Sequence, residues 1–574
     1  MDKKINVMLS TEGTYPFHPE GVSTWCDILV NQLRQVDYTV YSVMMNPFLS
    51  QIYSLPLSAT LIKVPLWGTE EPSEYLDVPF SKVYISKNRT TDDVVRNKFI
   101  PLFRTLISEV ISLEKNPTRL GGALHSMYLY FKEYEYKKSF KSEITWDVYK
   151  SMVYDYASVP ENGLDQPSVY DLIQSLGWLY RFMVILNTPV PKTDVTHSAA
   201  AAFCGIPCVL AKIEYNTPYM LTEHGVYIRE QYLSLSKRGY PSFLNTFFIR
   251  MINSIISLNY EYADTVAPVC RYNTRWEERF GVGSDKINVI YNGVDNKTFT
   301  PKDVKRKYRE PTVVSVARID PLKDILTLIE ATNIARKEIP DIKVSLYGSV
   351  SVDEYYEECK KRVKTLGLEN NFIFEGHTDN APEAYNTGDI VVLTSISEAF
   401  PYSVVEAMMS GKPVVSTDVG GIKEALGDCG ILATPGAPEE IAEGILTFLK
   451  DPDLIKEKSI ASRKRALEFF SIEKVLENHY NSYMRLMTAD REIKTVLPIT
   501  LLQKQKFYAE KGYTLLSMGY VREAIEQFRE AINASPNSPS VPVLMLEIAN
   551  SYKRLGEHDK AELEVIKSSA MTGI

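Results

Sequence analysis

Short apolar runs alternate with amphipathic helical segments over most of the chain. The run INVML at residues 5–9 leads into a glycine-bearing loop, a helix that begins near Trp25, and a second run, YTVYSVMM. The alternation resumes at Asp194 and predicts strands at TVAPV (265–269) and INVIYNGVD (287–295). Because strands separated by helices form parallel sheets, residues 1–296 are predicted to be a Rossmann-like α/β domain.

A second α/β domain is predicted at residues 297–470. Its apolar strands are TVVSVA, KVSLYG, FIFEG, IVVLTS and PVVST, and a helical segment with charged faces separates each strand from the next. These runs are apolar throughout, which is typical of strands covered by helices on both faces. The pattern is that of a doubly wound sheet. A further helix is predicted at residues 471–490.

Two parts of the chain depart from the α/β pattern. The segment from about 70 to 160 is rich in Tyr, Lys, Glu and Phe, and its amphipathic helices are interpreted as an insertion into the first domain. Residues 491–574 have only helical patterns. Their small and aromatic residues occupy the relative positions of two tetratricopeptide repeats (TPR): Gly512, Gly519, Ala524, Phe528, Ala531 and Pro536, then Ala549, Tyr552, Gly556 and Ala561.

This all-α, TPR-like module is small. Its small residues permit close helix crossing, and Phe528 fills the space between helices. Two repeats bury little apolar surface, so we expect the module to pack on the rest of the chain or to extend with a partner. An unrelated helical hairpin is the alternative.

The composition is that of a globular protein with more than one domain. Of 574 residues, 45% are hydrophobic and 24% charged, and the net charge of −8 without a long Lys/Arg run argues against a nucleic-acid-binding surface. No signal peptide is expected, and the nearly uncharged run 198–211 is too short to span a bilayer. Six cysteines lack a repeated spacing. Cys204 and Cys208 could share a helix face, but no second pair of ligands follows them, so we expect neither a disulfide framework nor a metal site.

Two glutamates lie at the start of a predicted helix. Glu398 follows the strand IVVLTS, at the sheet edge where ligands bind in parallel α/β proteins. Pro401 fits the first helical turn, so the amides of Tyr402 and Ser403 would be free to bind a phosphate. Glu406 lies about a turn further on, and its carboxylate could accept hydrogen bonds from the two hydroxyls of a ribose. The alternative is that both acids are solvated residues at a helix end.

Two cations follow another predicted strand. Arg318 and Lys323 flank a turn in SVARIDPLKD, just before a helix. A planar guanidinium and an ammonium at one strand end can clamp a diphosphate. The alternative is a surface turn with ion pairs to Asp320 or Asp324.

Glycines and histidines occur at other strand ends. Gly348 and the Gly376–His377 pair would let a nucleotide approach the backbone, and Gly21 leads into the first helix, where a phosphate could bind. His197 and His224 lie where apolar strands finish, and for each the alternative is a hydrogen-bonded structural role. The sequence contains no HExxH, no serine nucleophile elbow and no P-loop lysine motif.

Together these motifs resemble glycosyltransferase family 4. The resemblance rests on E-x7-E (Glu398, Glu406), the pair Arg318 and Lys323, YNGVD at 291–295, and PVVSTDVGG at 413–421. EGTYPFHPEGVSTW, LTEHGVYIRE and the helical insertion are closer still to the PelF-type Pel exopolysaccharide glycosyltransferases. The family implies a GT-B fold, in which two Rossmann-like domains face each other across a cleft and the 471–490 helix crosses back to the first domain.

The resemblance also implies roles for single residues. Glu406 would hold the ribose, Arg318 and Lys323 the diphosphate, and Glu398 would face the donor sugar, with His224 across the cleft. The nucleotide-binding residues that it implies are Gly21, Arg318, Lys323, Gly348, His377, Tyr402, Ser403, Val404 and Glu406. Many relatives have Gly-Gly where this chain has Glu20-Gly21. Glu20 could therefore contact acceptor hydroxyls instead of leaving room for the donor phosphate.

The function that the resemblance implies is retaining transfer of a hexosyl unit from a UDP-sugar, such as UDP-glucose or a related UDP-hexose. The acceptor would be a growing glycan in exopolysaccharide biosynthesis. We expect a cytoplasmic enzyme, peripheral to an inner-membrane assembly, that needs no cofactor or metal, with a membrane synthase as candidate partner of the TPR-like tail. The alternatives are a UDP-sugar epimerase or phosphorylase, and an adaptor that binds nucleotide sugars without turnover.

Overall fold

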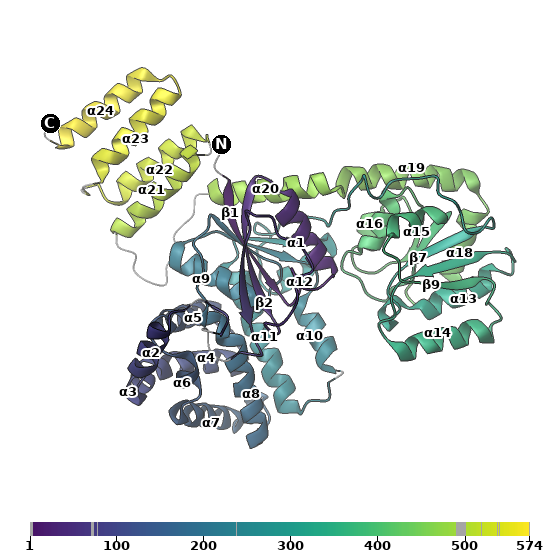
Figure 1. Cartoon of the computed structure of the whole chain (residues 1–574), viewed down its shortest axis with the longest axis horizontal. Coiled ribbons are helices and arrows are strands. Elements are labelled where there is room, and N and C mark those ends of the chain that lie inside the picture. The colour runs from purple at the N-terminus through teal and green to yellow at the C-terminus, as the bar shows by residue number, and fades with distance from the viewer. Residues whose placement is uncertain are drawn as a thin grey trace.

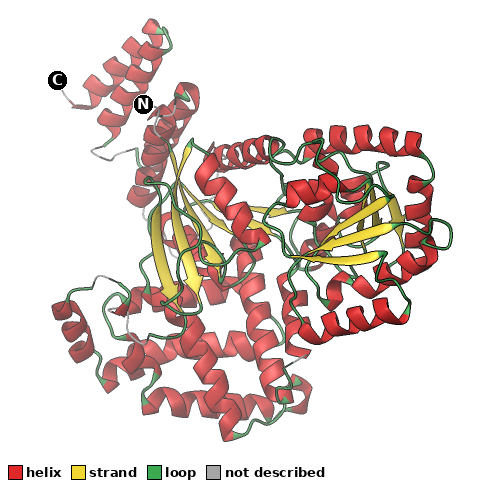
Figure 2. Ribbon diagram, turned by 45° about the vertical axis from the view of Figure 1, so that its right-hand side comes forward, coloured by secondary structure: helices red, strands yellow, loops and turns green. Residues whose placement is uncertain are grey.

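The chain contains two separate parallel sheets and a group of helices at its C-terminal end. The computed structural model describes residues 4–69, 74–76, 78–236, 238–488, 501–517, 519–536, 538 and 540–572. Each sheet has six strands, ordered β3-β2-β1-β4-β5-β6 in the first and β12-β11-β10-β7-β8-β9 in the second. Figure 2 shows the two sheets with helices on both sides of each, so both domains are Rossmann-like.

The first sheet belongs to the N-terminal domain, and its strands are parallel. In its register Ile5 pairs with Val36 and Val7 with Val195, which places the carboxyl ends of the strands at one edge. The strands are β1 (Ile5–Glu12), β2 (Val36–Met44), β3 (Thr60–Pro65), β4 (Val195–Ser198), β5 (Tyr219–Glu223) and β6 (Thr265–Pro268).

Helices from distant parts of the sequence cover one face of this sheet. Trp25 and Leu29 of α1 pack there with Tyr483 of α20, against Val7 and Leu9 of β1. The remaining helices of the N-terminal domain outside its insertion lie around the sheet. The bounds are α1 (Gly21–Gln32), α9 (Ile206–Tyr215), α10 (Tyr227–Ser236), α11 (Ser242–Tyr262), α12 (Arg271–Arg279) and α20 (Ile472–Thr488).

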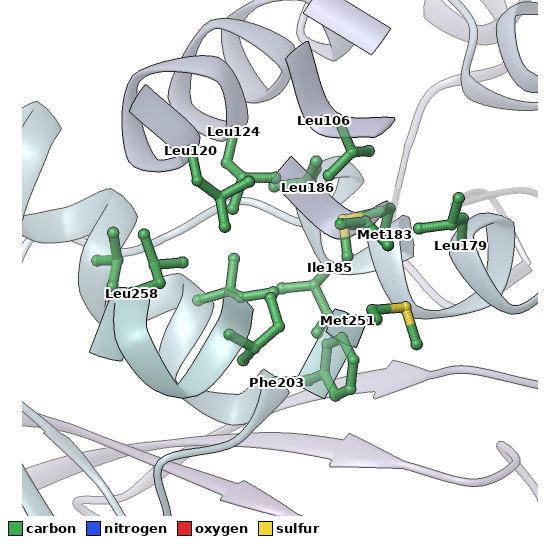
Figure 3. Close-up of a cluster of buried hydrophobic side chains, with 14 of the residues drawn as sticks. Leu106, Leu120, Leu124, Leu179, Met183, Ile185, Leu186, Phe203, Met251 and Leu258 are labelled. Carbon is green, nitrogen blue, oxygen red and sulfur yellow. The ribbon is translucent and has the colours of Figure 1, made fainter. Parts of the chain in front are cut away.

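The helical insertion packs on the opposite face. Its apolar side chains join Met8 and Tyr41 of the sheet in one large core. Figure 3 shows part of this core, where α4 and α5 meet α11 over Phe203. The elements are α2 (Phe80–Arg89), α3 (Asp92–Val94), η2 (Val95–Phe99), α4 (Ile100–Ile111), α5 (Pro117–Phe131), α6 (Tyr136–Phe140), α7 (Glu143–Ala157), η3 (Pro160–Asn162), α8 (Val169–Phe182) and η4 (Met183–Asn187).

The insertion is longer than the sequence pattern predicts. Helices continue to Asn187, beyond the predicted end near 160, because α8 and η4 contribute Leu179 and Met183 to the same core. At the predicted start, residues 70–73 lie outside the described residues.

The C-terminal domain contains the second sheet. Its strands are β7 (Thr312–Val316), β8 (Lys343–Tyr347), β9 (Phe372–Gly376), β10 (Ile390–Leu393), β11 (Val414–Thr417) and β12 (Ile431–Ala433). Its helices are α13 (Ile325–Ala335), α14 (Asp353–Thr365), α15 (Ala381–Thr387), α16 (Tyr402–Met409), α17 (Ile422–Leu426), α18 (Pro438–Leu449) and α19 (Pro452–Phe469).

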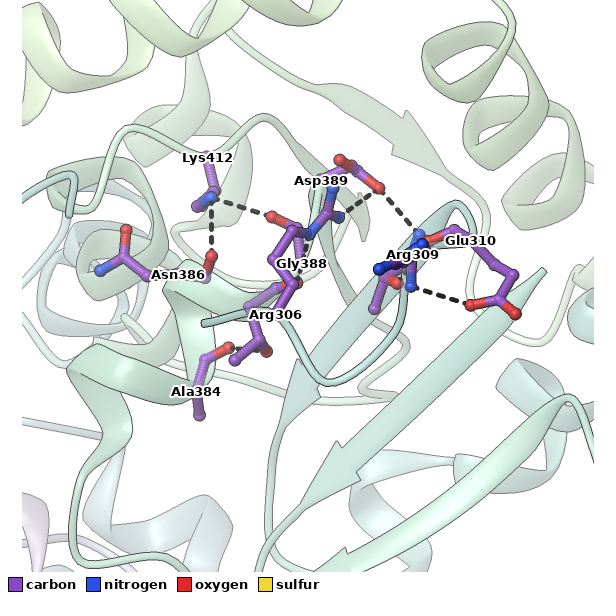
Figure 4. A network of polar contacts seen from close by, with 10 residues as sticks. Arg306, Arg309, Glu310, Ala384, Asn386, Gly388, Asp389 and Lys412 are labelled. Carbon is purple, nitrogen blue, oxygen red and sulfur yellow. Dashed lines mark hydrogen bonds and ion pairs between the residues drawn. The ribbon is translucent and has the colours of Figure 1, made fainter. Parts of the chain in front are cut away.

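A polar network fixes the amino ends of β7 and β10 (Figure 4). Asp389, just before β10, accepts a hydrogen bond from Thr312 N at 2.8 Å and pairs with Arg306 at 2.8 Å. Lys412 donates to the carbonyl oxygen of Gly388 at 2.8 Å. The network holds the strand starts in place, and the opposite edge of the sheet is free to carry the candidate site.

The strand predicted at 287–295 is wrong. This segment has only isolated bridges, Val266 with Ile287 and Val294 with Ser471. It crosses between the domains beside the start of α20, where a Cβ on Gly293 would lie 3.1 Å from the Ser471 carbonyl oxygen. The segment is apolar because Ile290 is buried in the core of the N-terminal domain and Val294 in a core of the C-terminal domain.

The helix α20 returns the chain to the N-terminal domain. In Figure 1, α19 and α20 follow one another along one side of both domains. Trp25 Nε1 donates to His479 Nε2 at 3.2 Å, and the Tyr483 hydroxyl lies 2.7 Å from His197 Nδ1. The predicted 471–490 helix is described as far as Thr488, and residues 489–500 lie outside the described residues.

The described part of the C-terminal region contains four helices: α21 (Leu501–Ser517), α22 (Val521–Ala534), α23 (Val541–Arg554) and α24 (His558–Thr572). Phe528 packs against Gly512 so closely that a Cβ there would lie 2.6 Å from its ring. The region is all-α, and its assignment to the TPR class stays a prediction. No described helix of the chain combines the length and apolar character needed to cross a membrane.

Candidate active site

The segments that follow the strands of one sheet contact the segments that follow the strands of the other. Arg229 of the N-terminal domain donates to the Ser397 hydroxyl of the C-terminal domain at 2.9 Å. Cys270, just after β6, lies 3.5 Å from the Ala399 carbonyl oxygen, measured from its Sγ. Each of these segments follows the carboxyl end of a strand. The candidate ligand-binding edges of both sheets therefore share one interface.

Lys323 and Glu398 meet directly at this interface. The turn η6 (Pro321–Lys323) follows β7, and Lys323 Nζ lies 2.5 Å from Glu398 Oε1. The Ser395 hydroxyl donates to the same oxygen at 2.6 Å. The two charged side chains are only 19% and 12% exposed, so the pair is largely removed from water. An ammonium held in this way can turn to an anionic ligand while Ser395 still holds the carboxylate.

Arg318 stands in the same loop but is open to solvent. Its side chain is 65% exposed, and its guanidinium lies 3.7 Å from the carboxylate of Asp320. Asp320 instead accepts a hydrogen bond from Leu322 N at 2.8 Å, which shapes the turn. The contact between Arg318 and Asp320 is long, so the guanidinium fork can still reach a ligand.

Glu406 lies in α16 and faces α15. The Tyr385 hydroxyl donates to Glu406 Oε2 at 2.8 Å. Burial raises the pKa of Glu406 to about 7, and the Tyr385 hydrogen bond opposes part of that rise. The carboxyl group is therefore balanced between its neutral and ionised forms near neutral pH.

The amino ends of two helices approach each other across the interface. Pro401 caps α16 without a side-chain hydrogen bond, and the amides of Tyr402, Ser403 and Val404 begin that helix. The Tyr402 ring lies 3.5 Å from the position of a Cβ on Gly21, the first residue of α1. The amino end of each helix carries a partial positive charge, which favours an anion nearby.

Gly348 and His377 lie at the ends of β8 and β9. A Cβ on Gly348 would lie 1.9 Å from the Ala317 carbonyl oxygen, so the close approach at this glycine is to the chain's own backbone. His377 is 67% exposed, and its Nε2 lies 3.0 Å from Asp379. Gly376 before it has φ of +81° and turns the chain after β9.

The two histidines singled out in the sequence have different environments. His197 is fully buried, and both its ring nitrogens have partners 2.7 Å away, Tyr483 and Thr222, so it is structural. His224 follows β5, and its ring lies 4.6 Å from Trp25, edge to face. Its Nε2 has no hydrogen-bond partner among the described residues, and burial lowers the pKa of His224 to about 3. A neutral imidazole is therefore presented beside α1.

Sequence reasoning missed the residues that hold these groups in place. Tyr385 and Ser395 carry no motif of their own. Glu424, in α17, accepts hydrogen bonds from Arg271 N at 2.9 Å and from the Tyr291 hydroxyl at 2.6 Å, and so joins the two domains. Tyr291 belongs to the YNGVD motif, but the sequence does not show its contact with Glu424, which lies 133 residues further along the chain. Within the described residues, no cluster of three or more His, Cys, Asp or Glu side chains is placed to hold a metal ion.

Two family models match consecutive parts of the chain. Residues 5–285 match the Domain of unknown function (DUF3492), and residues 296–466 match Glycosyl transferases group 1. The boundary between them falls in the segment that crosses between the two sheets. The first match includes the whole helical insertion.

Relatives are similar over parts of their length. N-acetyl-alpha-D-glucosaminyl L-malate synthase of Bacillus anthracis is 26% identical over 254 residues, 42% of this chain and 65% of that protein. The trehalose synthase of Pyrococcus horikoshii is 29% identical over 180 residues, 30% of this chain and 43% of that protein. The matches span less than two thirds of the length of either relative.

Solved structures are similar in fold. The structure of Anabaena HepE in complex with UDP has a TM-score of 0.51 at 16% identity and covers 84% of this chain and 100% of that chain. Sucrose-phosphate synthase from Thermosynechococcus elongatus has a TM-score of 0.52 at 16% identity and covers 85% of this chain and 100% of that chain. The two Rossmann-like domains fit the GT-B fold.

Proposed function

We propose that this chain, whose residues 296–466 form a domain of the glycosyl transferases group 1 family behind a DUF3492 domain, transfers a sugar from a nucleotide-sugar donor to an acceptor hydroxyl. The observation that carries the proposal is the meeting of Lys323 with Glu398 beside the uncapped amino end of α16. Cations and free amides at one strand edge match a diphosphate, and an adjacent carboxylate matches sugar hydroxyls.

The donor is a UDP-sugar, and UDP-glucose or a related UDP-hexose is the first candidate. Arg318 and Lys323 hold the diphosphate, and the amides of Tyr402, Ser403 and Val404 complete its cradle. Glu406 accepts hydrogen bonds from the ribose diol, while the backbone at Gly376–His377 contacts the base. HepE, a protein of similar fold, was crystallised in complex with UDP, and a uridine nucleotide is therefore the first to test.

Electrostatics would supply most of the rate acceleration. As the bond between the anomeric carbon and the β-phosphate oxygen breaks, that oxygen gains negative charge, and Arg318, Lys323 and the α16 amides lie ready to stabilise it. When the diphosphate draws Lys323 away, Glu398 remains held by Ser395 and faces the positively charged sugar. Neutral His224 donates or accepts a hydrogen bond at the sugar from the other domain.

The outcome at the anomeric carbon is retention, and the acceptor is a growing glycan in exopolysaccharide synthesis of the PelF type. These assignments rest on the family resemblance of the motifs. The C-terminal helices serve as a TPR-like module that recruits a membrane synthase. No metal or cofactor is part of the proposal, because two cations and a helix end already face the leaving group.

Release of UDP from a panel of UDP-hexoses tests the proposal. We expect Arg318→Ala and Lys323→Ala each to lower turnover by about 10²-fold or more, as removal of a group that stabilises the transition state does. Glu406→Ala should lower turnover at low donor concentration, because it weakens binding of the ribose. Lys360→Ala, an exposed cation in α14, is the matched control and should turn over like the wild type. Equal turnover in all the variants would refute these roles.

The same assay separates the alternative functions. Product analysis with and without a glycan acceptor distinguishes transfer from epimerisation or phosphorolysis. An adaptor would bind the UDP-hexose but release no UDP even with acceptor present.

A further inference from the structure

Three histidines surround the indole ring of Trp25, which is buried in the N-terminal domain. Its centroid lies 4.6 Å from the ring of His224, 5.3 Å from that of His197 and 5.5 Å from that of His479, each time in an edge-to-face contact. His479 belongs to α20, whereas His224 follows β5 at the interface between the two α/β domains. The indole therefore lies between the returning helix and a side chain of the candidate active site.

The position of the proton on His479 follows from its contact with Trp25. Burial lowers the pKa of His479 to about 3, so near neutral pH its ring has one N–H group and one lone pair. The indole Nε1 can only donate a hydrogen bond, and it donates to His479 Nε2 at 3.2 Å. The proton of His479 is therefore on Nδ1. The same bond directs the Nε1 edge of the indole toward α20, so the faces of the indole are left for its other neighbours.

The ring of His224 has one enclosed nitrogen. Its Nε2 is buried, and no described residue offers that atom a hydrogen bond. The residue as a whole is partly exposed, so the exposed part of the ring belongs to its other atoms, which include Nδ1. The ring is neutral, because burial lowers the pKa of His224 to about 3. The face of an indole carries negative charge, so it attracts an N–H group and repels a lone pair.

We propose that Trp25 is a positioning residue for His224, because it holds the Nε2–H group of His224 against the indole and leaves Nδ1 to accept a hydrogen bond from a hydroxyl of the donor sugar. The identity of that hydroxyl rests on the proposed function, whereas the position of the proton does not. His224 thus acts as an acceptor and not as a donor. His479 and His224 are neutral rings of opposite tautomer on the same indole.

Nuclear magnetic resonance of the full-length chain tests the tautomers without any turnover. Long-range correlation of ring hydrogens with nitrogen-15 in labelled histidine distinguishes a protonated ring nitrogen from one with a lone pair. His224→Gln identifies the signals of His224 by their loss. We expect Nε2–H for His224 and Nδ1–H for His479. Nδ1–H for His224 in the wild-type chain would overturn the inference.

Variants of Trp25 test whether the indole sets the tautomer of His224. Trp25→Leu removes the aromatic face, so we expect His224 to populate both tautomers, and Trp25→Phe, which keeps an aromatic face, should restore Nε2–H. Tyr483→Phe is the matched control, since it removes the hydrogen bond to His197 in the same group of rings and should leave His224 as in the wild type. Unchanged His224 signals in folded Trp25→Leu would overturn the inference. If that variant does not fold, the tautomer in the wild-type chain decides.

Release of UDP from UDP-glucose tests the consequence for catalysis. Trp25→Leu should lower kcat by about tenfold, which corresponds to one misplaced hydrogen bond. In the His224→Gln background the same change should lower kcat by less than about twofold, because a positioning residue acts through its partner. Losses that multiply in the double variant would overturn the positioning role. If the wild-type chain released no UDP, the proposed function would fail, and the tautomers would still decide this inference.

Discussion

The carboxyl group of Glu406 is buried, and its proposed role is to accept hydrogen bonds from a ribose. With its pKa raised to about 7 by burial, it changes charge near neutral pH. An ionised carboxylate can accept two hydrogen bonds from a ribose diol, whereas the acid form has already used one oxygen to carry a proton. We therefore expect the affinity for UDP to rise as the pH is raised through about 7, measured by titration calorimetry.

Two variants check the origin of this pH dependence. Glu406→Gln should bind UDP weakly and show only the slope that the ionisation of UDP itself produces. Tyr385→Phe removes the hydrogen bond that opposes the rise, so the midpoint should move to higher pH. Glu383→Gln, an exposed acid in α15, should leave the wild-type profile unchanged. If the Glu406→Gln profile matched the wild type, the ribose assignment would be wrong.

The same shift in pKa has a consequence for stability. The carboxyl group holds its proton more tightly in the folded chain than its ordinary value of 4.5 implies. Its contribution to stability is therefore full at low pH and is lost as the pH rises through about 7. Glu406→Gln, which stays neutral, should stabilise the ligand-free C-terminal domain at high pH by up to about 3 kcal/mol. Urea unfolding at low and high pH measures this, and an equal effect at both would contradict it.

At the residue scale, the sequence identified groups that the fold brings together but not the contacts between them. Glu398 and Lys323 were placed at two strand ends, and because β7 and β10 are neighbours those ends are adjacent. The direct ion pair could not be predicted, since it depends on side-chain reach across 75 residues of sequence. Tyr385 lacked any signal, because a buried tyrosine is common in helical cores.

At the scale of single elements, Gly348 shows that a glycine at a strand end can be required by packing. Alanine there would bring its Cβ to 1.9 Å from a backbone oxygen. We expect Gly348→Ala to destabilise the C-terminal domain by about 3 kcal/mol, as overpacking does. Gly376 has a positive φ but open space around it. Gly376→Ala should therefore lower the stability of the C-terminal domain by only about 1 kcal/mol. Hydrogen exchange of the β7 and β8 amides measures the loss of stability in each variant. Similar losses in the two variants would refute the packing explanation.

The helix α12 is capped by a side chain from the other domain. Cys270 offers no side-chain cap, and Glu424 of α17 instead accepts from the Arg271 amide. Glu424→Ala should cost about 1 kcal/mol, and the Arg271 and Tyr272 amides should exchange about fivefold faster. Lys423→Ala, an exposed neighbour, is the control. Unchanged exchange in Glu424→Ala would show that the cap does not hold the domains together.

The pattern of apolar runs predicted most strands but not all of them. Five strands of the second sheet were identified, while β12 was missed because ILA is too short to stand out. β3 was missed as well, since TLIKVP begins at an exposed residue and contains a lysine. The wrong strand at 287–295 is apolar for a different reason, the crossing between domains.

At the scale of the whole molecule, the chain is held together by segments far apart in sequence. The crossing at 287–295 and the return of α20 make two passages between the Rossmann-like domains. The contact of His479 with Trp25 joins α20 to α1, and that of Tyr483 with His197 joins α20 to the N-terminal sheet. This arrangement depends on packing between segments far apart in sequence, which cannot be predicted from the local pattern of apolar residues. The sequence predicted the two Rossmann-like domains because each has its own run of strands and helices.

The C-terminal helices form a core of their own. Leu515, Phe528, Leu544 and Ile548 are buried among residues of α21 to α24, and among the described residues that apolar cluster includes none from the other two domains. Lys192 and Glu510 form an ion pair at 2.6 Å between the helices and the N-terminal domain, and both side chains are about half exposed. A surface pair of this kind contributes about 1 kcal/mol or less. The core therefore stabilises the helices and adds little to the two α/β domains.

A chain that ends at Thr488 tests this independence. Because α20 remains, its contacts with Trp25 and His197 are kept, so we expect the shortened chain to melt at the same temperature as the corresponding transition of the full chain. Its affinity for UDP should be unchanged, since every proposed binding residue precedes Thr488. A second truncation, after Phe470, is the matched control and should unfold the N-terminal domain, because it removes the Tyr483 and His479 contacts. Aggregation of the Thr488 chain, or a loss of UDP binding, would show that the C-terminal helices are part of the core of the α/β domains and not an appended module.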